Sequence, residues 1–211
     1  MSKFSASMAL RMVRQHGIAA VGLLLLFFCI LLPEPLRAGG PTEQMRTTLD
    51  KVLAIVRNSN SNLEAKKEDI RARLVEVIYP RFDFTEMGKR SLGSHWGRRS
   101  AEEQREFVKV FTGLLARTYA DKIESYSTQS ILYTREIADK DYAEVDTKIV
   151  TDKDEELSIN YKLHNINNEW KVYDLVIEDV SLVNNYRSQF DRVIARSSFE
   201  ELIRVMKEKQ S

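Results

Sequence analysis

The fold is decided by residues 143–149, Ala143-Glu-Val-Asp-Thr-Lys-Ile149, in which apolar and polar side chains alternate one by one. A period of two places every second side chain on the same face of a β-strand. The alternation returns in residues 157–163, where Ile159 and Tyr161 lie on the apolar side. Short connections rich in Asp and Asn follow each segment, as antiparallel hairpins require. The two segments therefore predict adjacent antiparallel strands.

The strand pattern extends in both directions from this pair. Before it, Ile131, Tyr133 and Ile137 alternate with polar residues. After it, residues 170–177 carry apolar side chains on both faces. The sequence therefore predicts a meander of about four antiparallel strands.

Segments with helical spacing precede and follow the predicted strands in the sequence. Apolar residues recur every three or four positions in residues 42–56, 70–78, 100–123, 186–194 and 199–206. Thr42 is the expected N-cap of the first helix, and Pro80 ends the second. Ser100 and Glu103 match a capping box at the start of the third helix. Helices, then strands, then helices predict an α+β domain whose helices cover one side of the sheet.

The first 38 residues differ from the rest of the chain. Basic residues precede an apolar run, residues 18–32, which is shorter than the roughly 20 residues of a membrane-spanning helix. We expect residues 1–38 to be a secretory signal peptide cleaved after Ala38, with an uncleaved anchor helix as the alternative. Cleavage removes Cys29, the only cysteine. Residues 39–211 then form a single exported domain without a disulfide.

Composition and motifs argue against several classes of function. The 211 residues are 43% hydrophobic and 30% charged, which fits one globular domain. Removing residues 1–38 leaves a net charge of −2, so we expect no nucleic-acid partner. The glycines form no phosphate-binding loop, and His95 and His164 do not stand at metal-ligand spacing. We therefore expect neither a cofactor nor a metal.

One acidic residue offers an enzymatic interpretation. On strict alternation, Asp174 shares a strand face with Trp170, Val172 and Val176. A carboxylate in an apolar cavity would have a raised pKa suited to general-base catalysis. The alternative is a structural acid that pairs with an arginine or accepts backbone N–H bonds. We favour the structural role and do not expect an enzyme.

Four motifs stand in order along the chain. They are Pro80-Arg-Phe-Asp-Phe-Thr-Glu-Met-Gly-Lys-Arg-Ser-Leu-Gly93 with Trp96, Gln104-Arg-Glu-Phe107 leading to Thr118-Tyr119, Trp170-Lys-Val-Tyr-Asp174, and Val180-Ser-Leu-Val-Asn-Asn-Tyr-Arg187 with Gln189-Phe190. In this order and spacing the chain resembles the MlaC family of periplasmic phospholipid-binding proteins, also called the toluene-tolerance family. One departure is Asp179, where the family commonly has Gly.

The resemblance implies both a fold and a function. The fold is a curved antiparallel sheet covered by helices, similar to the nuclear-transport-factor-like group, with an apolar lipid cavity between sheet and helices. The function is that of a periplasmic carrier which shuttles phospholipid between the inner and outer membranes as the soluble component of an Mla-type ABC transport system. The implied partners are phospholipid, an inner-membrane ABC transporter with an MCE-domain subunit, and an outer-membrane lipoprotein complex. Two alternatives stay open, namely a cavity-containing isomerase or hydrolase and a ligand-free scaffold subunit.

A lipid carrier needs an apolar pocket, because exposing acyl chains to water costs about 0.8 kcal/mol per methylene group. The residues expected to line it are Phe107, Phe111, Leu114, Tyr119, Val145, Ile149, Ile159, Tyr161, Val172 and Val176. The alternative is that these side chains pack into a solid core. The residues expected to contact a head group or a partner are Arg81, Lys89, Arg90 and Arg98, with a solvated charged surface as the alternative.

Overall fold

An antiparallel sheet organises the described part of the chain, residues 39–58, 64–124, 130–150 and 155–209 of a computed structural model. Within these residues five strands pair in the order β1-β2-β3-β4-β5. The strands are β1 (Ser130–Asp139), β2 (Tyr142–Val150), β3 (Glu156–Ile166), β4 (Glu169–Ile177) and β5 (Val180–Ser181). The predicted meander is confirmed, and a two-residue fifth strand is added beside β4.

The tight turns of the meander use residues that tolerate a left-handed backbone. Asn167 and Asn168, between β3 and β4, have φ angles of 53° and 67°. Two consecutive residues with positive φ give a hairpin turn whose twist matches that of the strands. Glu178 and Asp179, between β4 and β5, have φ angles of 46° and 62°. Glycine occupies this region without steric cost, which explains why Gly suits the position that Asp179 holds here.

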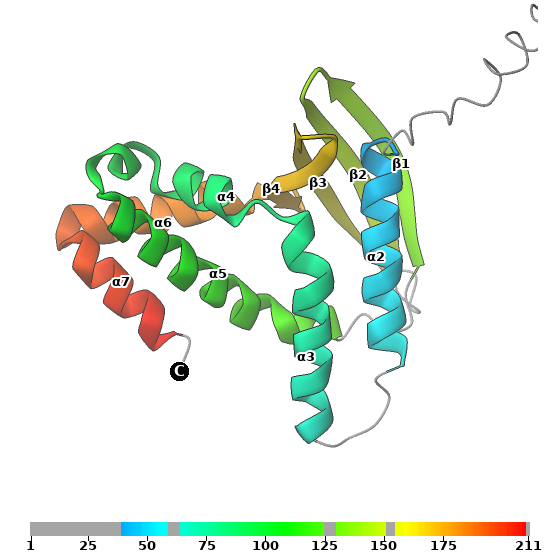
Figure 1. Ribbon diagram of the computed structural model, residues 1–211, viewed down its shortest axis with the longest axis horizontal. Coiled ribbons are helices and arrows are strands. Elements are labelled where there is room, and N and C mark those ends of the chain that lie inside the picture. The colour runs from blue at the N-terminus through cyan, green and yellow to red at the C-terminus, as the bar shows by residue number, and fades with distance from the viewer. Residues whose placement is uncertain (1–38, 59–63, 125–129, 151–154, 210–211) are drawn as a thin grey trace, which may run out of the picture. The chain divides into compact units, whose positions relative to one another are not determined.

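Six α-helices accompany the sheet in the described residues. They are α2 (Pro41–Arg57), α3 (Glu64–Ile78), α4 (Phe84–Leu92), α5 (Ala101–Glu124), α6 (Leu182–Arg196) and α7 (Phe199–Glu208), with the 3-10 turns η2 (Tyr79–Arg81) and η3 (Gly93–Arg98) on either side of α4. Helix α2 lies along one face of the sheet, and α4 to α7 pack together beside its β4 end (Figure 1). This arrangement confirms the predicted α+β class.

The helix starts follow local capping chemistry, with one correction. The Ser100 N–H donates to Glu103 Oε2 at 2.6 Å, and the Glu103 N–H donates to Ser100 Oγ at 3.2 Å, so the predicted capping box is confirmed. The prediction of Thr42 as N-cap is wrong, because α2 begins one residue earlier at Pro41. Proline suits the first helical position, where no N–H partner exists. The Thr42 N–H instead donates to Glu136 Oε2 of β1 at 2.8 Å.

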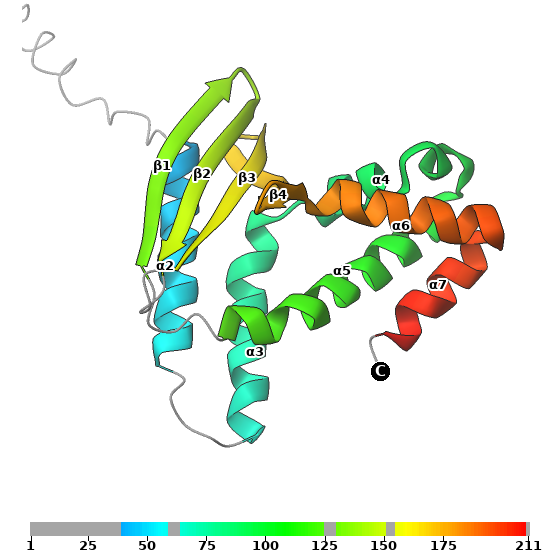
Figure 2. The same ribbon diagram turned by 180° about the vertical axis from the view of Figure 1, so that it is seen from behind.

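Three groups of buried side chains hold these elements together. The sheet core, between α2 and the inner face of the sheet, consists of Met45, Ala143, Val145, Tyr161, Leu163, Trp170 and Val172. The helical core joins α4, α5, α6 and α7 and includes Phe107, Phe111, Tyr186, Phe190 and Phe199. The third group joins α2 to α3 through Ile55, Val56, Ile70 and Leu74. Helix α3 therefore stands between α2 and the C-terminal half of α5 (Figure 2).

A β-bulge in β4 changes which residues face the sheet core. Leu163 of β3 pairs with Val172, but the preceding Lys162 pairs with Asp174 instead of Tyr173. An extra residue in one strand inverts the alternation beyond it. Leu175 therefore lies opposite Tyr161, while Val176 pairs with Asn160 on the other face. The prediction that Asp174 and Val176 share the face of Val172 is wrong for this reason.

The described residues begin at Gly39. No helix among them is long and apolar enough to cross a membrane. The expected signal peptide, residues 1–38, lies outside the described residues. The compact unit that contains the sheet and the helices covers residues 38–211.

Candidate functional site

A cavity of about 580 Å³ opens between α3 and α5. The α3 wall is formed by Leu74, Val75 and Ile78, with Arg71 one turn before them. The α5 wall is formed by Thr112, Gly113, Leu115, Ala116, Arg117, Tyr119, Ala120 and Ile123. Tyr79, Phe82, Phe84, Met87, Leu175 of β4 and Leu182 of α6 complete the lining. The site is thus built from helices and from the β4 end of the sheet.

The cavity exists because small residues of α5 face α3. Gly113, Ala116 and Ala120 recur three or four positions apart, which places them on one side of the helix. None of these residues carries a side chain long enough to fill the space in front of α3. The larger α3 residues Leu74 and Ile78 are held from behind by the contacts of α3 with α2. The packing of α3 against α2 therefore keeps α3 separated from α5, and an apolar space remains between the two helices.

The cavity is apolar inside and basic at its mouth. Val75 and Tyr79 are 37% and 36% exposed and mark where the cavity meets solvent. Arg117 on α5 is exposed, and Arg71 on α3 is half-buried. None of the described residues that line the cavity is acidic. Burial raises the pKa of Tyr79 and that of Tyr119, so both hydroxyls stay protonated at neutral pH.

The α5 residues predicted to contact lipid lie on both faces of the helix. Phe107 and Phe111 are fully buried and Leu114 is buried, and all three belong to the helical core. The Phe107 ring contacts Phe190 edge-on, with the ring centroids 5.6 Å apart. Tyr119 is the one of these four residues that lines the cavity.

The strand residues predicted to contact lipid do not line this cavity. Val145, Tyr161 and Val172 are buried in the sheet core against Met45 of α2. Ile159 packs against the same core, Ile149 is buried, and Val176 is half-buried on the opposite face. Leu175 is the β4 residue that reaches the cavity instead. The α2 helix covers the inner face of the sheet, so the space lies beside the sheet.

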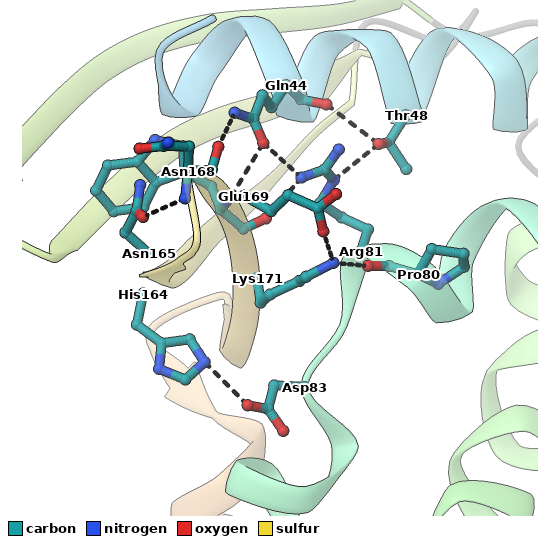
Figure 3. Close-up of polar contacts among 11 residues, drawn as sticks. Gln44, Thr48, Pro80, Arg81, Asp83, His164, Asn165, Asn168, Glu169 and Lys171 are labelled. Atoms are coloured by element: carbon teal, nitrogen blue, oxygen red, sulfur yellow. Dashed lines mark hydrogen bonds and ion pairs between the residues drawn. The ribbon is translucent and has the colours of Figure 1, made fainter. Parts of the chain in front are cut away.

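Arg81, predicted to contact a head group, is engaged inside the protein (Figure 3). Its Nε donates to Thr48 Oγ1 at 3.0 Å, and its Nη1 donates to Gln44 Oε1 at 2.8 Å. The same Nη1 donates to the carbonyl oxygen of Trp170 at 2.6 Å. Burial lowers the pKa of Arg81, and the nearby charge of Glu169 opposes this shift. Arg81 therefore ties α2 to β4 from the loop after α3.

Two further contacts extend this polar cluster along β3 and β4 (Figure 3). Lys171 Nζ donates to the carbonyl oxygen of Pro80 at 2.8 Å and also pairs with Glu169. His164 Nε2 lies 3.1 Å from Asp83 Oδ2, and Asp83 Oδ1 accepts the Glu86 N–H that starts α4. These contacts fix the loop between α3 and α4 to the sheet, and with it one end of the cavity.

The other basic residues predicted for the head group lie away from the cavity lining. Lys89 and Arg90 both pair with Glu86 on α4, at 3.3 Å and 2.8 Å. The Arg90 guanidinium also stacks over the Tyr173 ring, 4.2 Å from its centroid. Arg98 is exposed at the end of η3. The structure therefore brings none of the four predicted cations to the mouth.

Asp174 has structural partners at the start of α6. It is only 6% exposed. Its Oδ1 accepts the Val183 N–H at 3.0 Å, and its Oδ2 accepts the Ser181 hydroxyl at 2.6 Å. A carboxylate at a helix N-terminus satisfies free N–H groups and complements the helix dipole. Asp174 does not line the cavity, and its contacts agree with the structural interpretation.

Sequence reasoning missed most of the lining, although a signal for it was present. Only large apolar side chains were expected to line the pocket, whereas the α5 wall also contains the small residues Gly113, Ala116 and Ala120. Arg71 stands three residues before Leu74 and four before Val75, so the apolar spacing of α3 already placed it on the same side. Arg117 follows Gly113 by four positions. Helical spacing from Leu74 and Val75 on α3, and from Gly113 on α5, would have found both arginines.

The chain is similar to known proteins in sequence and in structure. Residues 46–208 match the sequence model of the MlaC protein family. The intermembrane phospholipid transport system binding protein MlaC of Haemophilus influenzae is 24% identical over 176 residues, which cover 81% of this chain and 82% of that protein. The toluene tolerance protein ttg2D of Pseudomonas putida is 24% identical over 165 residues, which cover 74% of this chain and 77% of that protein.

A solved structure adds a match in three dimensions. It is that of a phospholipid-binding protein from Ralstonia solanacearum in complex with a phospholipid. The TM-score is 0.72 at 27% identity, and the match covers 82% of this chain and 97% of the other. The family resemblance found in the sequence motifs and the expected α+β fold with a curved antiparallel sheet are thereby confirmed, whereas the cavity lies between α3 and α5 and not on the inner face of the sheet. Since the family match spans well over half of its residues, this chain belongs to the MlaC protein family.

Proposed function

We propose that this protein is a periplasmic carrier that binds phospholipid and shuttles it between the inner and outer membranes. The observation that carries the proposal is the apolar cavity between α3 and α5 in a member of the MlaC family. The related Ralstonia protein was solved with a phospholipid bound. An acyl chain in this cavity would be shielded from water by Leu74, Ile78 and Leu115.

The size of the cavity sets what it holds. If a methylene group fills about as much space as a water molecule, about 30 Å³, then 580 Å³ accommodates roughly 20 methylene groups. That is about one long acyl chain. Burying 16 methylene groups yields roughly 13 kcal/mol at about 0.8 kcal/mol each.

The same proposal includes the partners of the carrier. They are an inner-membrane ABC transporter with an MCE-domain subunit and an outer-membrane lipoprotein complex, as the family resemblance implies. The sequence has no phosphate-binding loop of its own, so the energy for directional transport comes from such a transporter. Residues 1–38 would act as the signal peptide for export to the periplasm.

We assign no catalytic residue in this carrier. Asp174, the acid considered for catalysis, uses both carboxylate oxygens to hold the start of α6. A carrier needs the cavity walls and an opening, and both are supplied by α3 and α5.

Filling the cavity tests the proposal. The purified protein should carry phospholipid that native mass spectrometry detects. Ala116→Trp places a large ring in the space between α5 and α3, so we expect at least a tenfold loss of bound lipid. Ala72→Trp is the matched control, because Ala72 is exposed on α3 and does not line the cavity.

The control should keep the lipid load of the wild type, and circular dichroism should confirm the fold of both variants. A wild-type protein without lipid after exposure to phospholipid vesicles would refute the carrier function. Equal lipid loads in Ala116→Trp and Ala72→Trp would move the binding site away from the α3–α5 cavity.

A further inference from the structure

We propose that Arg71 and Arg117 form a binding site for the anionic phosphate head group of a lipid at the mouth of the cavity. The proposal rests on the proposed function and names the class of lipid that the site selects. Arg71 reaches the cavity from α3 and Arg117 from α5, so the two cations come from opposite walls. A head group between them would be held from both sides.

The charge around the cavity favours a negative ligand. Both arginines line the cavity, and none of the described lining residues is an aspartate or glutamate. A guanidinium offers a planar fork of donors that matches phosphate oxygens. Its aliphatic stem can lie along the apolar wall while the charged end stays in water. The pair therefore combines contact with an acyl chain and contact with a phosphate in one site.

The two arginines are not equivalent. Arg71 is half-buried and has a further interaction within the chain. Arg117 is exposed at the rim, and its guanidinium has no ion-pair partner in the part of the chain that the structure describes. A head group would therefore gain more from Arg117, and removal of this side chain should have the larger effect.

Two other basic side chains, Arg81 and Arg90, bind partners within the protein. Arg81 donates to Gln44, Thr48 and Trp170. Arg90 pairs with Glu86 and stacks on Tyr173. These residues hold the scaffold around the site, whereas Arg71 and Arg117 face the space that a ligand would occupy.

The absence of acid among the described lining residues decides between classes of phospholipid. A zwitterionic lipid carries a choline or ethanolamine cation beside its phosphate. With two arginines and no acid among the described lining residues, the cavity mouth repels that cation and attracts an anionic head group. The site should therefore prefer phosphatidylglycerol to phosphatidylcholine when the acyl chains are the same.

A competition within one membrane tests this preference. The purified protein is incubated with vesicles that contain equal amounts of phosphatidylglycerol and phosphatidylcholine with identical acyl chains. It is then separated from the vesicles, and mass spectrometry measures both bound lipids. Because both lipids lie in the same vesicle, attraction of the protein to the charged surface raises both loads equally. We expect the wild type to enrich phosphatidylglycerol about tenfold.

The variants locate the source of the preference. Arg117→Gln should reduce the enrichment to about threefold, and Arg71→Gln combined with Arg117→Gln should abolish it. Arg117→Lys should keep part of it, because the charge remains without the fork of donors. Arg105→Gln on α5 and Arg73→Gln on α3 are charge-matched controls, since both residues are exposed and lie outside the lining. These controls should match the wild type.

The outcomes separate this inference from the proposed function. A normal total lipid load with no preference for phosphatidylglycerol in the wild type would overturn the head-group site and leave the carrier intact. A preference that survives the double substitution would do the same. No lipid bound to the wild type from either class would refute the carrier and the head-group site together. If the double variant fails to fold, Arg117→Gln and Arg117→Lys decide the question.

Discussion

The two faces of helix α5 differ in the size of their side chains more than in their polarity. One face carries Phe107, Phe111 and Leu114, which fill the helical core against α6 and α7. The other face carries Gly113, Ala116 and Ala120, which leave a cavity in front of α3. Apolar side chains predominate on both faces, yet one face forms a solid core and the other encloses space.

This contrast explains why the predicted lipid-contacting residues lie mostly outside the cavity. Large apolar side chains bury the most surface, so they pack most tightly against any neighbour. Space remains where small residues face a helix whose opposite side is fixed by other contacts. Helix α3 is fixed in this way by its packing against α2. On α5, the small residues therefore mark the cavity wall, whereas Phe107 and Phe111 mark the solid core.

The largest expected effect comes from shortening a side chain of α5 that is buried in the helical core. Phe111→Ala should lower the free energy of unfolding by about 4 kcal/mol, because it leaves a void in a fully packed core. Val75→Ala on the cavity wall, 37% exposed, should cost less than about 1 kcal/mol. Urea unfolding monitored by circular dichroism measures both values. Equal losses would mean that the cavity wall is packed as tightly as the helical core.

A smaller effect is expected where α2 joins the sheet. Arg81→Gln removes a guanidinium that donates hydrogen bonds to Thr48 and to the Trp170 carbonyl. The free energy of unfolding should therefore fall by about 2 kcal/mol. Arg98→Gln, at an exposed position, should change stability by less than about 0.5 kcal/mol. Thermal and urea denaturation compare the two variants. If Arg81→Gln were as stable as Arg98→Gln, Arg81 would be available for a ligand.

An effect confined to alkaline solution is expected from the buried tyrosines. Burial raises the pKa of Tyr161 in the sheet core, and it raises that of the neighbouring Tyr133 to about 12. The unfolded chain loses these protons near pH 10. The neutral phenol therefore stabilises the fold fully below pH 10, and this contribution is lost as the pH rises toward the raised pKa. For Tyr161 the loss is about 1.4 kcal/mol per pH unit above 10.

Replacing single tyrosines tests this dependence on both sides of the molecule. Tyr161→Phe should show a shallower loss of stability than the wild type between pH 10 and 11.5. Tyr79→Phe should change the slope less, since Tyr79 is 36% exposed at the cavity mouth. The measurement is urea unfolding at several pH values. A Tyr161→Phe slope equal to that of the wild type would contradict the role assigned to burial.

Local patterns in the chain were sufficient for the class of fold and the family. The alternation of residues 143–149, the Ser100–Glu103 capping box and the ordered motifs from Pro80 to Phe190 all act over a few neighbouring residues. Periodicity and capping depend on backbone geometry that repeats within one element. Such features can be recognised without knowing what packs against them.

The position of the cavity and the roles of individual residues depended on contacts between distant segments. One inserted residue in β4 moved Asp174 and Val176 to the other face of the sheet. Arg81 is occupied by Thr48, Gln44 and Trp170, which lie 33, 37 and 89 positions away. An apolar residue becomes core or cavity wall according to the size and spacing of whatever faces it, and a cation is free or engaged according to partners that the folded chain alone brings near.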